Sequence, residues 1–411
     1  MAEDTIEQTR PRSAINSKGF CWMFVCVSVA LLLPAALSWF FLYRAGEFED
    51  PRSIAKWLQR TNGLYGTALN NNARDIALSI YLERKPEIIV LSSSRGTEFR
   101  QQYFKSKFSC VCMMISNIEE GIGFFEKVKD VYLPKTVILA LDYWWFSETD
   151  DHITQPAPDL GKVIPVSRDE LLKPYEWIGQ HKIGVSDFAA IVSGNLDRSP
   201  FSHEPKLGVQ AIKKSFGTRA DGSWSVMSVA TNTDLHPLFT TIKLQMRNPD
   251  LILKEKFGRY APDQKLSEEK LAILRDLVGR FEKQGTGVVL MLLPVANPIV
   301  EEMENSGRYT FVSALRERLG KLGVEYYDFF DSRLFATACE FQDQHHGGNA
   351  MYARMLKLIL DRNKDSILVR HVDRTAVASI AERWKGRVVA ALGEETPRFH
   401  EVDFLDLGCK K

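Results

Sequence analysis

The feature that most constrains this chain is Phe20–Leu42, a run of 23 residues without a charged side chain. As an α-helix this run is about 34 Å long, which is enough to cross a hydrocarbon core of ~30 Å with some tilt. Trp22 and Trp39 lie near its two ends, where amphipathic rings favour the membrane interface. We therefore predict a transmembrane helix over residues 20–43, preceded by an N-terminal tail of residues 1–19.

A cleaved signal peptide is the alternative for the same segment. The apolar region of a signal peptide spans only ~7–15 residues and ends in small residues. Here the small pair Ala35-Ala36 is followed by the largely apolar stretch Leu37–Leu42, so the apolar run continues past any such cleavage point. The pattern favours an uncleaved anchor.

The charges that flank the predicted span indicate its orientation. Arg10, Arg12 and Lys18 precede it, whereas Arg44 follows it directly. Because Lys and Arg are enriched on the cytoplasmic side, this asymmetry favours a cytoplasmic N-terminus. In a bacterium the chain would then be a single-pass protein of the inner membrane, with the large domain in the periplasm.

Charge and cysteine content limit the partners that we expect. The formal net charge is +1, so there is no basic excess to neutralise the phosphates of a nucleic acid. Of the six cysteines, Cys21 and Cys26 lie in the predicted span, and no pair has the neighbours of a zinc site. Cys110 and Cys112 point to one face of a predicted strand. We expect no metal, no cofactor and no nucleic-acid partner.

Alternating strand and helix patterns predict an α/β fold. Short apolar runs bounded by small or polar residues are typical of buried parallel strands. They occur at residues 87–91, 111–115, 136–141, 287–293 and 324–328. Helical patterns lie at 117–130, 267–284, 308–322 and 350–361. This alternation predicts a parallel sheet covered by helices on both faces.

The strand and helix pattern also divides the chain. Residues 44–84 are predicted to form a linker and a short helix, and residues 85–365 the α/β domain. Residues 366–411 form a C-terminal extension to which we assign no structure. An insertion at 150–265 interrupts the domain and is rich in Pro, Gly and polar residues, with helical pieces near 169–179 and 185–193.

An insertion of this length between two core strands is typical of a lid, a substrate wall or a partner surface. We expect it to shape the acceptor side of a site rather than the core of the fold. On this expectation, replacing Asp221, Gly222 and Ser223 with alanine would alter acceptor use more than thermal stability.

Reactive residue types follow two predicted elements. Ser92-Ser93-Ser94-Arg95-Gly96 comes after the first strand, and Asp343-Gln344-His345-His346 comes before the last helix. Ligands of open parallel sheets bind at the carboxyl ends of the strands. An Asp three residues before a His can orient the imidazole, which can then take the proton of a serine hydroxyl. The alternatives are structural roles, namely a serine that caps a helix and histidines at the surface whose hydrogen bonds are already made. The combination of the two segments favours a catalytic site.

This combination resembles the SGNH (GDSL-like) hydrolase family over residues 85–362. The similarity is greatest to its membrane-anchored branch, which includes O-acetyltransferases of alginate and related exopolysaccharides and the teichoic-acid D-alanylation protein. Residues 139–146 and 217–223 also look like this branch. The resemblance implies a flavodoxin-like three-layer domain, with Ser94 as nucleophile, His346 as base and Asp343 as the residue that orients it.

Further site residues are expected from their positions near the strand ends. Candidates for the oxyanion hole are the backbone of Ser94, Asn117 and Gly121, whereas Asp142 is disfavoured because an acid would repel an oxyanion. Candidates for substrate binding are Arg95, Tyr143 and Trp144. The alternatives are a structural ion pair for Arg95 and core packing for the two aromatic residues.

Together these features predict a membrane-tethered serine acyl-group enzyme. We expect an O-acetyltransferase that modifies an extracytoplasmic polysaccharide through an acyl-Ser94 intermediate. The family resemblance implies that a separate multi-span membrane protein delivers the acyl donor. The alternatives are a carbohydrate esterase, that is, a deacetylase, and a catalytically degenerate protein that binds glycan or organises a synthase complex.

Overall fold

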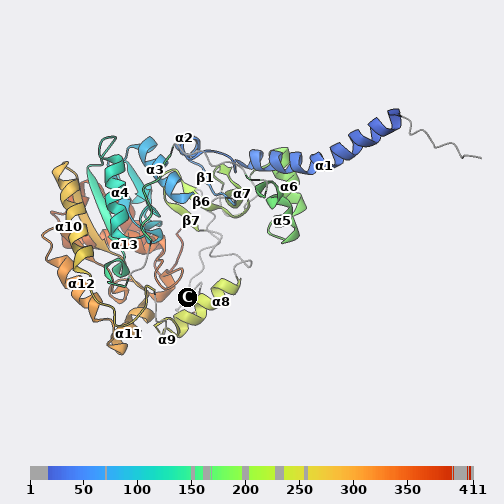
Figure 1. Ribbon diagram of the computed structural model, residues 1–411. Helices are drawn as coiled ribbons and strands as arrows, with labels where there is room; N and C mark the ends of the chain where they lie inside the picture. The colour runs from blue at the N-terminus through green and yellow to red at the C-terminus, as the bar shows by residue number, and fades with distance from the viewer. Residues whose placement is uncertain are drawn as a thin grey trace, which may run out of the picture. The chain divides into compact units, whose positions relative to one another are not determined.

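The structure is a computed structural model that describes residues 17–69, 72–149, 153–160, 167, 169–196, 203–226, 236–253, 258–390, 392, 405 and 407–408. It has a mixed α/β fold with a parallel sheet and one N-terminal apolar helix (Figure 1). The chain forms two compact units, residues 1–44 with 165–194 and residues 45–164 with 195–411.

The smaller unit is built around the apolar helix α1 (Ser17–Ala45), which is long and apolar enough to cross a membrane, although a signal sequence would meet the same criteria. The side chains of its first half are exposed, and Trp22, for example, is 71% exposed. Near its end, α5 (Lys173–Gly179) and α6 (Val185–Ser193) lie against it, at the predicted helical pieces. The Phe188 ring stacks on Phe41 at 4.7 Å between centroids.

The larger unit contains the five-stranded sheet, in the order β3-β2-β4-β8-β9, with every neighbouring pair parallel. Its strands are β2 (Ile88–Leu91), β3 (Phe108–Val111), β4 (Thr136–Leu141), β8 (Gly287–Leu292) and β9 (Glu325–Asp328). The strand expected at 111–115 is wrong, because β3 ends where that run begins. Met113 adopts a positive φ of 62°, which takes the chain out of the sheet.

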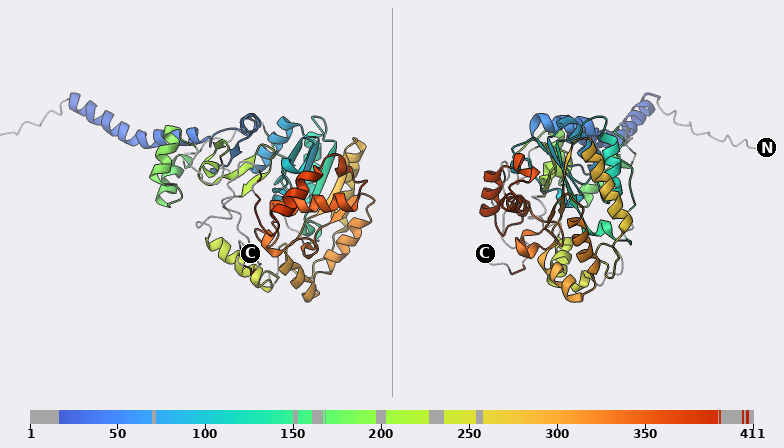
Figure 2. Two further views of the ribbon diagram at one scale, coloured as in Figure 1. Left: turned by 180° about the vertical axis from the view of Figure 1, so that it is seen from behind. Right: turned by 90° about the vertical axis from the view of Figure 1, so that its left-hand side faces the viewer.

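Helices cover the sheet in pairs. The right-hand view of Figure 2 shows one pair, α4 (Ile118–Val128) and α10 (Glu268–Lys283), on the opposite side of the sheet from the other, α13 (Asn349–Arg362) and α14 (Arg374–Arg383). Other helices of this unit are α2 (Pro51–Thr61), α3 (Ala73–Arg84), α7 (Val209–Lys214), α8 (His236–Arg247), α9 (Asp250–Leu253), α11 (Asn297–Ser306) and α12 (Thr310–Gly320). The C-terminal extension thus contributes α14 to the α/β unit.

A second, four-stranded sheet has the order β5-β1-β6-β7 (Figure 1). It combines β1 (Leu64–Tyr65) from the linker with β5 (Lys206–Leu207), β6 (Phe216–Arg219) and β7 (Trp224–Val226) from the insertion. Gly217 has φ 153°, and a Cβ there would collide with the backbone carbonyl of Tyr65 in β1. Sequence patterns do not predict this sheet, because its strands span two to four residues and none of them is a continuous apolar run of four residues like β2.

A disulfide lies at the end of β3, which is an edge strand of the main sheet. Cys110 in β3 and Cys112 just beyond it form a disulfide, and both side chains are buried. Their spacing of two residues places both thiols on one face, as the sequence indicates. Cys339 is also disulfide-bonded, whereas Cys21 and Cys26 are free.

Candidate active site

The serine turn begins where the buried strand β2 ends. Ser93 caps the short 3₁₀ helix Ser94–Gly96, because its hydroxyl accepts the N–H of Arg95 at 3.2 Å. The capping alternative therefore holds for Ser93, and it leaves the neighbouring hydroxyl of Ser94 available. Gly96 keeps the turn tight, since a Cβ there would collide with the Ser92 hydroxyl.

The histidine loop is held by the carboxylate of Asp343. Its Oδ1 accepts the backbone N–H groups of His345 at 2.9 Å and of His346 at 2.8 Å. Its Oδ2 lies 2.6 Å from Nδ1 of His346. One carboxylate thus fixes both the backbone of the loop and the ring of His346, just before α13.

The structure brings Ser94, His346 and Asp343 together. The Ser94 hydroxyl lies 2.9 Å from Nε2 of His346, across 252 residues of sequence. The side chains of His346 and Asp343 are 26% and 20% exposed, so the site is open to solvent. This is the order of contacts that a nucleophile, a base and an orienting acid require.

The protonation of Asp343 sets the tautomer of its neighbour. Burial raises the pKa of this carboxyl, but its interactions with His346 and His345 outweigh burial and hold the pKa well below its usual range. The ionised carboxylate therefore accepts from Nδ1 of His346. Nε2 is left with a lone pair directed at the Ser94 hydroxyl, which is the arrangement of a general base.

His345 is held away from this role. Tyr260 Oη lies 2.8 Å from its Nδ1, and Arg259 Nη1 lies 2.8 Å from its Nε2. A guanidinium only donates, so Nε2 accepts and Nδ1 carries the proton. Burial lowers the pKa of His345 well below 6.5, and Arg259 and Arg95 add to this against the opposing Asp343. His345 is a neutral histidine that positions the loop.

Donor atoms of Asp343, His345 and His346 lie within 4.8 Å of one another, a spacing that could suit a metal ion. Their partners indicate otherwise. Asp343 already accepts three N–H groups, and the cationic Arg259 occupies Nε2 of His345. A cation there would have to displace a guanidinium, so the cluster fits a hydrogen-bonded triad better than a metal centre.

The side chain of Arg95 joins the serine turn to the histidine loop and to the end of β4. Its Nη1 donates to Asp142 Oδ1 at 2.8 Å, its Nε to the carbonyl of His345 at 2.8 Å, and its Nη2 to the carbonyl of Pro294. The side chains of Arg95 and Asp142 are both 1% exposed. Because its donors are used inside the protein, Arg95 has the structural role considered as the alternative, and the substrate-binding expectation is wrong for it.

The two aromatic candidates are also part of the core. Tyr143 is fully buried, and its hydroxyl donates to the carbonyl of Arg259 at 2.8 Å. Trp144 is 4% exposed, with the guanidinium carbons of Arg95 and Arg259 at 5.0 and 4.8 Å from its ring. Neither ring has a face free for a sugar. The expectation that they bind substrate is wrong, and the core-packing alternative holds.

Two of the three oxyanion candidates serve helix α4 instead. Asn117 is fully buried, caps α4 by accepting the N–H of Glu120, and donates to Thr154 at 3.1 Å. Gly121 faces α10, where a Cβ would lie 2.6 Å from Cδ2 of Leu277. The backbone N–H of Ser94 remains, and it has no hydrogen-bond acceptor within the part of the chain that the structure describes.

The insertion supplies residues of the site that the sequence analysis did not predict. Arg259 and Tyr260 bind His345, and Gln245 on α8 lies 2.6 Å from Gln344 through their side-chain amides. Their only signal in the sequence is the polar character of the insertion, which does not distinguish them from its other residues. No protein-family model, curated protein or solved structure matches this chain. The functional argument therefore depends on the geometry of the site.

Proposed function

We propose that this chain is a membrane-tethered serine acyl-group enzyme, an O-acetyltransferase that modifies an extracytoplasmic polysaccharide. One observation carries the proposal, namely the pair of contacts that joins Ser94 to His346 at 2.9 Å and His346 to Asp343 at 2.6 Å. The same three residues on these two segments are those that the SGNH-like resemblance assigns to catalysis. The parallel sheet with helices on both sides supports the three-layer arrangement of that family.

In the first half-reaction, Ser94 Oγ attacks the carbonyl carbon of the acyl donor while His346 Nε2 takes the hydroxyl proton. The developing oxyanion is stabilised by the N–H of Ser94, and Asp343 stabilises the imidazolium. The tetrahedral intermediate collapses, the bond to the leaving group breaks, and His346 returns the proton to that group. Acyl-Ser94 remains.

In the second half-reaction, a sugar hydroxyl attacks the ester and gives its proton to Nε2 of His346. When the new intermediate collapses, the acyl group leaves on the sugar and Ser94 Oγ regains the proton. If water takes the place of the sugar, the same steps release a free acid, so a carbohydrate esterase is the second candidate. The solvent exposure of His346 favours that candidate, because water has access to the base.

The apolar helix α1 supports the membrane part of the proposal. With Arg10, Arg12 and Lys18 ahead of it, we place the α/β unit in the periplasm and the chain in the inner membrane, where a multi-span partner would deliver the acyl donor. A reporter that is active only outside the cytoplasm, fused after Lys411, should be active. Activity of a cytoplasmic reporter at the same position would reverse this topology.

Acyl transfer is tested with the full chain and a model ester such as p-nitrophenyl acetate. Mass spectrometry should find one acetyl group on Ser94, and none in Ser94→Ala or His346→Ala. Ser92→Ala is the matched control, because the Ser92 hydroxyl is buried and donates to the carbonyl of Ser93. A parent protein that is folded and yet never acylated would support the degenerate glycan-binding alternative. Adding oligosaccharide acceptors then separates transferase from esterase.

A further inference from the structure

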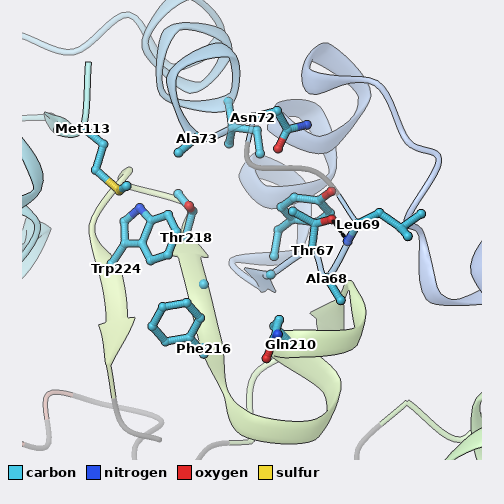
Figure 3. A pocket seen from close by; sticks show the side chains of 14 residues that line it. Thr67, Ala68, Leu69, Asn72, Ala73, Met113, Gln210, Phe216, Thr218 and Trp224 are labelled. Atoms are coloured by element: carbon cyan, nitrogen blue, oxygen red, sulfur yellow. Dashed lines mark hydrogen bonds between the residues drawn. The ribbon is translucent and has the colours of Figure 1, made fainter. Parts of the chain in front are cut away.

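A cavity of about 460 Å³ lies between the second sheet and the start of α3 (Figure 3). Its volume is in the range of small-molecule sites. It is separate from the serine triad, and its walls come from the linker, the insertion and the loop after β3. Six of its fourteen described lining residues carry the argument: Asn72, Met113, Gln210, Phe216, Thr218 and Trp224.

One wall of the cavity is aromatic. Trp224 of β7 and Phe216 of β6 pack edge to face with centroids 5.2 Å apart, and Figure 3 shows Met113 next to the indole. All three side chains are only half-buried, so part of their surface faces the cavity. In this respect they differ from Tyr143 and Trp144, whose rings are enclosed. An indole face that borders a cavity offers a flat apolar surface to a ring-shaped ligand.

The opposite wall holds a buried polar group without a partner. Asn72 is 9% exposed, and its Oδ1 has no hydrogen-bond partner within the described part of the chain. A buried amide oxygen in this state loses its hydration without compensation. Asn72 precedes α3 but makes no capping bond with its side chain. The oxygen itself is covered in this conformation, so a ligand hydroxyl that donates to it would satisfy it after a small shift of the Asn72 side chain toward the cavity. Gln210 and Thr218 add further polar atoms to the lining.

No charged side chain is among the described residues that line the cavity, and the buried carboxyl of Glu47 lies behind one wall, where it accepts hydrogen bonds from Thr67, Ala68 and Leu69. None of the fourteen lining residues, as described, is an Asp, Glu, Lys, Arg or His. A uronate or a phosphate in this cavity would give up its hydration without meeting a counter-charge, so a charged ligand is disfavoured. An aromatic face, side-chain amides and hydroxyls without charge together suit a neutral sugar ring, whose C–H face is apolar and whose edge carries hydroxyls.

The walls of the cavity are bonded to the serine turn. The N–H of Met113 donates to the carbonyl of Ser93 at 3.2 Å, and the N–H of Trp224 donates to the carbonyl of Thr97 at 3.0 Å. These acceptors lie one and three residues from Ser94. We infer that this cavity is a binding subsite for an uncharged sugar residue. That the sugar belongs to the acceptor of acyl transfer rests on the proposed function, whereas sugar binding itself does not.

Calorimetry on the full chain tests the subsite directly. The protein should be held in lipid nanodiscs, since maltoside detergents carry a neutral sugar of their own. The probes are cellotetraose and chitotetraose as neutral chains and tetragalacturonate as a charged chain of the same length. At least one neutral probe should bind, and tetragalacturonate should bind at least about tenfold more weakly.

Two variants locate the binding. Trp224→Ala and Asn72→Ala should each weaken binding of the neutral probe about tenfold, whereas Trp224→Phe should keep most of it. Asn72→Ala should fold normally, because its side chain forms no cap. The matched control is Gln102→Ala, an exposed glutamine outside this cavity whose side chain donates to the carbonyl of Leu392. Equal binding of the charged probe, or unchanged binding by both alanine variants, would overturn the inference.

The result is independent of catalysis, because the measurement uses Ser94→Ala as well as the parent chain. If Ser94 acylates but no neutral tetrasaccharide binds, the subsite is refuted while the proposed acyl chemistry stands. If a neutral tetrasaccharide binds with the predicted sensitivity to Trp224 and Ser94 is never acylated, the subsite stands and the acyl chemistry is refuted.

Discussion

The change of Asp343 to Asn separates the chemical role of this residue from its structural one. In the parent, Oδ1 accepts two backbone N–H groups and Oδ2 accepts from Nδ1 of His346. An asparagine can keep its oxygen on the two backbone groups, which turns its NH₂ toward the histidine. Nδ1 must then accept, so the ring proton moves to Nε2 and points at the Ser94 hydroxyl. The serine loses its base while the loop keeps its shape.

The expected losses follow from this geometry. A triad whose histidine is in the wrong tautomer loses about 10⁴ in rate, which corresponds to roughly 5 kcal/mol of barrier at about 1.4 kcal/mol per decade. The backbone bonds survive, so the free energy of unfolding should fall by only about 1 kcal/mol. Asp343→Ala removes all three bonds and leaves two N–H groups without an acceptor, so it should cost about 2–4 kcal/mol of stability as well as activity.

Two measurements on the same samples test this reasoning. Stopped-flow acylation of Ser94 by p-nitrophenyl acetate gives the rate constant, and denaturant unfolding gives the stability. Asp343→Asn should be close to the parent in stability and close to His346→Ala in rate. If Asp343→Asn acylates within tenfold of the parent, the tautomer argument is refuted. If it unfolds as readily as Asp343→Ala, the two backbone bonds do not survive and the structural half of the reasoning fails.

Further predictions concern buried groups of the α/β unit. Arg95→Met should lower the free energy of unfolding by about 3–5 kcal/mol, because Asp142 is left buried and unpaired, and Arg95→Met with Asp142→Leu should recover part of the loss in urea unfolding. Gly222→Ala should lower the melting temperature more than Gly285→Ala: both have φ near 80°, but only a Cβ at Gly222 would collide with the carbonyl of Cys110. Burial lowers the pKa of His371 to about 4, with Arg370 adding to the effect, so the unfolded chain takes up this proton first as the pH falls. Stability should therefore drop between about pH 6.5 and pH 4, by up to about 3 kcal/mol, and His371→Gln should flatten this dependence.

The three inner strands of the main sheet, β2, β4 and β8, were predictable because they are apolar and buried on both faces. The run 136–141 coincides with β4, whose residues are all buried. The misplaced strand has a physical cause, since Met114 and Ile115 after β3 are as buried as strand residues although they lie in a loop. Apolar character reports burial, and only backbone dihedrals such as that of Met113 distinguish a loop from a strand. The second sheet has no such signal.

The role expected for the insertion is only partly supported. The turn Asp221–Ser223 is buried against β3, where the carbonyl of Asp221 accepts the N–H of Cys110 at 2.7 Å and its carboxylate accepts the N–H of Gln101 at 2.7 Å. Alanine replacement of this turn should therefore reduce stability, contrary to the sequence-based expectation. Residues 258–261, by contrast, bind the histidine loop. Composition alone cannot separate these two parts, because both are polar.

The three residues that the structure brings together at the candidate site were predictable, whereas the residues that hold them in place were not. Ser94, Asp343 and His346 follow from residue type and from position at the ends of a strand and before a helix, both of which are local in sequence. The environment of Arg95 and Trp144 depends on contacts with segments more than a hundred residues away, Arg259 among them. A position at a strand end therefore indicates proximity to a site but not whether a side chain faces the ligand or the core.

The ion pair between Asp142 and Arg95 affects the charge near Ser94. An unpaired acid at the end of β4 would repel the oxyanion of the tetrahedral intermediate that we propose on the way to acyl-Ser94. Here the guanidinium of Arg95 lies 2.8 Å from this carboxylate, and both are almost fully buried, so the pair adds little net charge to the site. The same guanidinium binds the carbonyl of His345. Because Arg95 directly follows Ser94, one side chain both neutralises Asp142 and fixes the serine turn to the histidine loop. We expect this hydrogen bond to hold Ser94 at its distance from His346, so Arg95→Met should slow acylation even under conditions where the protein remains folded.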